Sequence, residues 1–95
     1  MIYEKLELPD IFANLTESEI GVLWCVIQGI TNKEIGERLY ISLGTVKFHL
    51  SSLYKKTQTR TRTALTNKVL LFLINRPLNF ELFSEIFSKK TDKNL

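Results

Sequence analysis

The apolar positions within residues 31–56 form two runs at helical spacing, separated by a few residues. In the first run, Ile35 and Leu39 share one face of a short helix expected over residues 32–40. In the second run, Val46, Leu50 and Leu53 recur at i, i+4 and i+7, so the spacing predicts a longer helix over about residues 43–57. The positions that this helix turns away from the core are Lys47, Phe48, Ser51, Tyr54 and Lys55. Two helices joined by a tight turn predict a helix-turn-helix unit.

Residues 15–29 predict a helix that precedes this unit. Thr16 and Glu19 have the spacing of a capping box, Leu15 and Ile20 have that of a hydrophobic staple, and Gly29 is a typical C-terminal stop. On this helix, the single Trp24 is either an exposed interaction residue or a cap on the N-terminal arm. The same start signals recur before the second helix.

The second half of the chain predicts two further helices. The first covers residues 62–76 and ends before Pro77. Apolar residues lie on nearly all sides of this helix, so part of its surface must contact either a second copy of the chain or the residues that follow. Residues 78–90 predict an amphipathic helix that competes for that surface, and its phenylalanines are more often core than a partner site.

The expected fold is therefore all-α, with three parts. Residues 1–14 form a short apolar N-terminal arm, for which we favour a cap over the core rather than an effector-sensing role. Residues 15–76 form a four-helix domain, and residues 77–95 form a C-terminal helical extension. A chain of 95 residues is long enough for one helical core and not for two.

Charge is distributed unevenly along the chain, whose formal net charge is +3. The segment 40–62 contains no Asp or Glu, and its basic residues are Lys47, Lys55, Lys56, Arg60 and Arg62. Basic charge gathered on one segment favours a polyanionic partner, and we expect the phosphates of double-stranded DNA.

Other functional classes find little support in the sequence. Cys25 cannot form an internal disulfide, which favours a reducing cytoplasm, and its surroundings predict an inert buried thiol. His49 has no companions at metal-ligand spacing, so we expect no metal site and no cofactor. No nucleophile–base arrangement is apparent, so we expect no enzyme. The longest apolar run, residues 69–74, is too short to span a membrane.

Residues 15–62 resemble the helix-turn-helix domain of the LuxR/GerE family of bacterial transcription regulators. The matching positions, in register without a gap, are Leu15, Thr16, Glu19, Val22, Leu23, Gly29, Asn32, Lys33, Glu34, Ile35, Leu39, Ile41, Ser42, Thr45, Val46, Lys47, His49, Lys56 and Arg62. The chain departs from the family pattern after Lys56, where Thr57, Gln58 and Thr59 replace a leucine, a glycine and an aliphatic residue. Gly36 replaces the usual alanine, and a small residue there would let the second and third helices approach closely.

The resemblance implies a recognition helix over about residues 43–57 that enters the major groove of DNA. The candidate contact residues are Thr31, Asn32, Lys33, Thr45, Lys47, Phe48, Ser51, Lys55 and Lys56. Plain N-capping by Thr31 or Asn32 can hold at the same time as a contact with the DNA backbone. Lys47 suits a guanine or a phosphate, whereas Lys55 and Lys56 suit phosphates. Phe48 either contacts a thymine methyl group or packs against Tyr40, and Gly44 either permits close phosphate approach or is merely tolerated.

The resemblance also implies a homodimer formed through the fourth helix. The residues that we assign to either a dimer contact or packing of the tail are Leu65, Val69, Phe72 and Leu73. The leading hypothesis is a self-standing, sequence-specific transcription regulator that reads two half-sites about one helical turn apart. The alternative is an interaction module that binds RNA polymerase or another regulator through the fourth helix and the tail.

Overall fold

The chain is described by a computed structural model over residues 12–74 and 80–87, where every regular element is a helix. The elements are α1 (Glu17–Ile27), α2 (Asn32–Leu39), α3 (Leu43–Thr57), α4 (Arg62–Leu73) and α5 (Phe80–Phe87). This confirms the predicted all-α class with an additional C-terminal helix. The fourth helix ends at Leu73, earlier than the predicted residue 76, because Ile74 leaves the helical conformation with ψ 136°. The predicted ends of the tail helix, and most of the N-terminal arm, lie outside the described residues.

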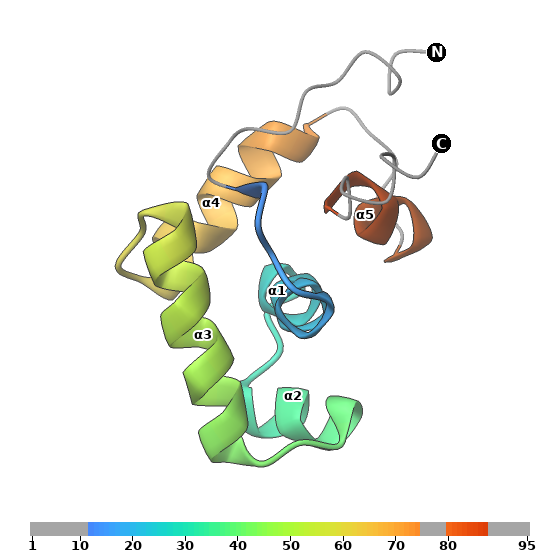
Figure 1. The fold of residues 1–95 in the computed structure, drawn as a ribbon, viewed down its shortest axis with the longest axis vertical. Helices are drawn as coiled ribbons and strands as arrows, with labels where there is room; N and C mark the ends of the chain where they lie inside the picture. The colour runs from blue at the N-terminus through green and yellow to red at the C-terminus, as the bar shows by residue number, and fades with distance from the viewer. Residues whose placement is uncertain (1–11, 75–79, 88–95) are drawn as a thin grey trace.

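The helix α1 lies at the centre of the molecule and packs against each of the other helices. Figure 1 shows α1 nearly end-on, with α3 on one side and α5 on the other. Its side chains Ile20, Val22, Leu23 and Val26 are all buried, because the helix is covered on several sides. The core is thus organised around α1, which holds α3 in place from behind.

Hydrogen bonds from side chains fix the starts of α1 and α2, as the sequence predicts. The Glu19 N–H donates to Thr16 Oγ1 at 3.1 Å, and the Thr16 N–H donates to Glu19 Oε1 at 2.9 Å. The same reciprocal pair joins Thr31 and Glu34, at 3.2 and 3.3 Å. Each box satisfies backbone donors that the first turn of a helix leaves unpaired.

Residues in the left-handed backbone region follow three of the helices. Gly29 has φ +79°, which confirms it as the stop after α1. Tyr40 and Gln58 both have φ +59° and end α2 and α3, although neither is a glycine. Gln58 therefore occupies a conformation for which the family's glycine is better suited, and the departure from the family pattern does not move the end of α3.

Gly36 lies where α2 meets the turn that leads into α3. A Cβ atom at this position would be 2.7 Å from the Ile41 carbonyl oxygen and 3.6 Å from Val46 Cγ2. The Gly36 carbonyl also accepts a hydrogen bond from the Ile41 N–H at 2.9 Å. The close approach expected at Gly36 is confirmed, and most of it involves the backbone of the turn.

An aromatic cluster joins the tail helix to the rest of the core. Phe87 lies 5.3 Å from Phe12 and 5.9 Å from Phe72 between ring centroids. Trp24 of α1 lies 5.1 Å from Phe83 and is half-buried. The burial of Phe12 agrees with the cap expected of the arm's last residues. Phe80 and Phe83 of α5 pack against the Trp24 ring, and the predicted contact between Trp24 and residues 1–11 lies outside the described residues.

The fourth helix is divided into a buried face and an exposed face. Leu65, Val69 and Leu73 are buried in the chain's own core, and Phe72 packs on the tail through Phe87. The described structure thus accounts for all four candidate residues by internal packing. The apolar surface that α4 leaves exposed includes Leu70 and Leu71, which the sequence analysis did not single out. No helix among the described residues has the length and apolar content needed to cross a membrane.

Candidate nucleic-acid interface

The helix α3 has one face in the core and one in solvent. Val46, Leu50 and Leu53 are buried, as their spacing predicts, and they pack toward α1 and α2. The residues that α3 exposes are Leu43, Gly44, Lys47, Phe48, Ser51 and Lys55. The core therefore fixes the orientation of the helix and leaves its outer face open along its whole length.

The exposed face of α3 is basic and lacks acidic side chains. Lys47 and Lys55 are both exposed, and no Asp or Glu occurs between Tyr40 and Arg62. Lys33, at the start of α2, is exposed as well. Such a surface attracts phosphates, and the outer face of α3 contains no carboxylate that would repel them.

Phe48 is 69% exposed, which is unusual for a large aromatic side chain. Its ring centroid lies 5.7 Å from that of His49, its neighbour in the chain. Tyr40 is 93% exposed, so the two rings do not cover each other, and the predicted packing of Phe48 against Tyr40 is wrong. His49 itself is half-buried.

Hydroxyl groups cap the first turn of α3. Ser42 Oγ accepts from the Thr45 N–H at 3.1 Å and lies 3.0 Å from Thr45 Oγ1. Gly44 is exposed between them, and a Cβ there would have only an ordinary contact, 3.8 Å from Ser42 Oγ. Internal packing therefore does not require glycine at position 44.

The candidate residues at the start of α2 also have structural roles. Thr31 takes part in its capping box, and the Asn32 carboxamide oxygen accepts from Arg62 Nη1 at 2.7 Å. Arg62 Nη2 donates to the Ile30 carbonyl oxygen. Arg62 thus ties the start of α4 to the start of α2, a role that the sequence did not reveal. Of the three candidates, Lys33 has no side-chain partner among the described hydrogen bonds and ion pairs.

Lys56 is held at a buried carboxylate on the side of α3 that faces α1. Its Nζ donates to Glu19 Oε1 and to the Asn14 carbonyl oxygen, both at 2.8 Å. Ser52 Oγ donates to Glu19 Oε2 at 2.6 Å. The expected phosphate contact of Lys56 stays a prediction, but the observed geometry gives this lysine a structural role.

The Glu19 carboxyl group is buried, with 4% of its surface exposed. Burial alone would raise its pKa, but hydrogen bonds from Lys56, Ser52 and the Thr16 N–H outweigh it, so the pKa lies below its ordinary value of 4.5. The sequence identified Glu19 only as half of a capping box. Ser52 and Lys56 are more than thirty residues from Glu19 in the sequence, and no local sequence pattern connects them to it.

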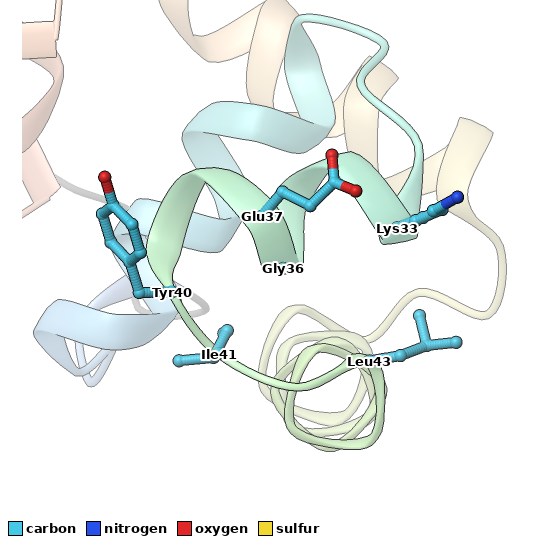
Figure 2. Close-up of a pocket in the computed structure, with 6 residues that line it drawn as sticks. All are labelled: Lys33, Gly36, Glu37, Tyr40, Ile41 and Leu43. Atoms are coloured by element: carbon cyan, nitrogen blue, oxygen red, sulfur yellow. The ribbon is translucent and has the colours of Figure 1, made fainter.

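A shallow hollow of about 350 Å³ lies beside the turn between α2 and α3. Its lining comprises Lys33, Gly36, Glu37, Tyr40, Ile41 and Leu43. Figure 2 shows Lys33 and Leu43 at one end of this hollow and Tyr40 and Ile41 at the other. Glu37 between them is a carboxylate, so the hollow as a whole is not suited to a phosphate.

Cys25 and the titratable groups of the described residues suggest no chemical site. Cys25 is buried, and burial raises the pKa of its thiol above 9.0 although Arg38 and Arg62 act in the opposite direction. The burial of Cys25 is thus confirmed, and the inertness of its thiol stays a prediction. Within residues 12–74 and 80–87, no three His, Cys, Asp or Glu side chains gather in a way that could hold a metal ion.

Comparison with known proteins identifies the helical unit. Residues 13–69 match the family described as bacterial regulatory proteins, luxR family. Transcriptional regulatory protein LnrK of Bacillus subtilis is 48% identical over 59 residues, which are 62% of this chain and 27% of LnrK. Nitrate/nitrite response regulator protein NarP of Escherichia coli is 45% identical over 67 residues, which are 70% of this chain and 30% of NarP. The chain thus spans less than a third of the length of these relatives, and no solved structure matches it significantly.

Proposed function

Because this chain belongs to the luxR family of bacterial regulatory proteins, we propose that it is a sequence-specific DNA-binding transcription regulator that places α3 in the major groove. Membership in a family of regulators also agrees with the expectation that the chain is not an enzyme. One observation supports the proposal most directly: α3 is held from behind by Val46, Leu50 and Leu53, and its outer face is basic. A rigidly mounted helix with such a face is what the major groove accepts.

The exposed residues of α3 receive separate tasks in this proposal. Lys47 and Ser51 lie on the outer face and read base edges, and Phe48 contacts a thymine methyl group. Lys55 and Lys33 contact phosphates on either side of the groove. Lys56 and Asn32 act indirectly, because their side chains bond to Glu19 and Arg62 and so hold the reading surface in place.

We further propose that the active species is a homodimer acting in the cytoplasm, joined through the exposed face of α4. Leu71 is 70% exposed, and Leu70 beside it is also exposed. Neighbouring exposed leucines on one helix favour a protein contact, since such a patch is costly in water. A two-fold dimer would then present two copies of α3 to a palindromic site about one helical turn apart.

Fluorescence anisotropy with selected and random DNA duplexes tests the DNA-binding proposal. We expect affinity to fall as salt rises, with the selected duplex preferred over the random one by at least about 1000-fold. Lys55→Ala should lower the slope of log K against log salt by about one unit, whereas Lys47→Ala should weaken binding to the selected duplex and relax the preference at the base pair that it reads. Binding that does not vary with salt, or that shows no sequence preference, would rule the proposal out.

Arg38→Ala provides a control that removes the same charge elsewhere. Arg38 is exposed and lies two residues, or about 200°, beyond Gly36, whose Cα faces the turn before α3. Its side chain therefore projects away from α3. This variant should keep the salt slope of the unchanged protein.

The alternative function, an interaction module for RNA polymerase or another regulator, is favoured by the same exposed leucines of α4. The two proposals differ in which variant abolishes gene regulation. Lys47→Glu combined with Lys55→Glu should abolish it if DNA contact is required. If regulation survives that pair and is lost in Leu71→Glu, the interaction module is the better description.

A further inference from the structure

Leu43 is an apolar side chain at the first position of α3 that the proposed function does not use. It is 46% exposed, but a single exposed leucine is ordinary in proteins and by itself assigns no role. Its neighbours are more informative. Figure 2 shows Leu43 on the same side of the α2–α3 pair as Lys33 and far from Tyr40. Lys47 follows Leu43 at i+4 and lies on the same side of the helix.

The surface between Leu43 and Phe48 is open. Gly44 precedes Phe48 by one turn, and apart from its chain neighbours and the backbone of α3 only Ser42 Oγ lies within 4 Å of the position that its Cβ would occupy. Leu43 and Phe48 are thus two exposed apolar side chains on the N-terminal half of α3, about 140° apart around the helix, with Gly44 and Lys47 on the exposed surface between them. Lys47 between them and Lys33 beside Leu43 place both apolar side chains next to the DNA, if α3 enters the groove as proposed.

We propose that Leu43 is a specificity-determining residue and that, together with Phe48, it selects half-sites with thymines opposite the first turns of α3. This inference rests on the proposed function. The thymine C5-methyl is the apolar group that base pairs display in the major groove. Neither side chain can bond to the polar edge of another base, and covering such an edge leaves its donors and acceptors unpaired. An apolar side chain at either place therefore discriminates in favour of thymine.

Replacing thymine by deoxyuridine tests the inference, because the exchange removes only the methyl group. A half-site selected from random duplexes is substituted one thymine at a time, and affinity is measured by anisotropy at fixed salt. We expect two positions at which the exchange weakens binding about three- to fourfold, the effect of removing one buried methyl group. Leu43→Ala should abolish the difference at one of these positions and Phe48→Ala at the other.

Two further variants serve as controls. Leu43→Met keeps an apolar side chain of similar volume and should retain the thymine preference. Tyr40→Ala removes a more exposed side chain at the opposite end of the hollow and should also retain it. Circular dichroism of each variant should show the helical content of the unchanged protein.

The results separate this inference from the function on which it rests. Selected half-sites without thymine, equal affinity for thymine and uracil, or an unchanged preference in Leu43→Ala would each overturn the inference. It would also be overturned if Leu43→Ala binds DNA normally but loses a protein partner that occupies the hollow. If the unchanged protein selects a sequence and Lys47→Ala weakens binding to it, the proposed function survives any of these outcomes. If no sequence is selected, both proposals fail.

Discussion

Glu19 has two roles at the same time, and both concern the position of α3. Its backbone and one carboxylate oxygen complete the capping box of α1, and the carboxylate also binds Lys56 and Ser52 of α3. A buried carboxylate is costly unless its lone pairs are satisfied, so this cluster penalises any displacement of α3 relative to α1. One residue thereby couples the start of one helix to the placement of another.

Acid should weaken this coupling. The pKa of Glu19 is lower in the folded chain than its ordinary value of 4.5, so its contribution to stability is complete above that value and is lost as pH falls through the folded pKa. Glu19→Gln should lower the free energy of unfolding by about 1–3 kcal/mol at neutral pH and flatten its dependence on pH below 4.5. Urea unfolding at a series of pH values measures both effects.

Glu34→Gln is the matched control, because Glu34 closes the same kind of box on α2 without a buried ion pair. This substitution should alter the pH dependence less than Glu19→Gln does. Equal flattening in both variants would show that the ion pair with Lys56 is not the source of the effect.

The residues in the left-handed region that follow α1 and α3 offer a second test at the residue scale. Gln58→Gly should raise the free energy of unfolding by about 0.5–1 kcal/mol, because glycine adopts φ +59° without strain and the exposed glutamine side chain makes little contact. The opposite change, Gly29→Ala, should lower it by about 1 kcal/mol. Nothing lies within 4 Å of the added methyl group, so that cost comes from the backbone alone. Thermal unfolding of the two variants should give shifts of opposite sign.

At the scale of elements, short sequence motifs predict where the helices begin, whereas contacts between distant residues determine which side chains each helix packs against. Thr16 and Thr31 were recognised as caps because a capping box lies within four residues of sequence. The partner of Trp24 was not recognised, because Phe80 and Phe83 reach it only through the tertiary fold. The buried face of α4 could not be predicted either, since apolar residues on nearly all sides of a helix do not indicate which side packs into the chain's own core.

The tail helix α5 should be an integral part of the core. Phe83 is buried against Trp24 and Phe87, so Phe83→Ala should lower the free energy of unfolding by about 3–4 kcal/mol. Trp24 is the chain's single tryptophan, and its emission should shift to longer wavelength as its ring becomes more exposed. Glu81→Ala, on the exposed side of α5, is the control and should leave both unfolding and emission unchanged. If α5 were not part of the core, the unchanged protein, Phe83→Ala and Glu81→Ala would all show the same tryptophan emission.

At the scale of the whole molecule, two surfaces face solvent with different chemistry. The outer face of α3 is basic and contains a large exposed aromatic ring, whereas the outer face of α4 exposes adjacent leucines. The sequence predicted the first surface well, because three buried positions on α3 fix where Lys47, Phe48 and Ser51 point. It did not predict that Lys56 and Asn32 would be bound to Glu19 and Arg62, since those partners come from other helices.

If the second surface joins two chains, changing it should separate dimerisation from folding. Leu71→Glu should reduce the mass seen by analytical ultracentrifugation to that of a monomer, because two carboxylates would oppose each other across a two-fold contact. Since Leu71 is 70% exposed, the melting temperature should change little.

Affinity for a palindromic site should fall by at least about tenfold while affinity for a single half-site is kept, because linkage between the two reading helices is lost. Phe48→Ala should instead weaken binding to both the palindromic site and the single half-site, and the mass measured by ultracentrifugation should stay that of the dimer. A protein that is monomeric while it occupies both half-sites would contradict the dimer and leave the surface of α4 to another partner.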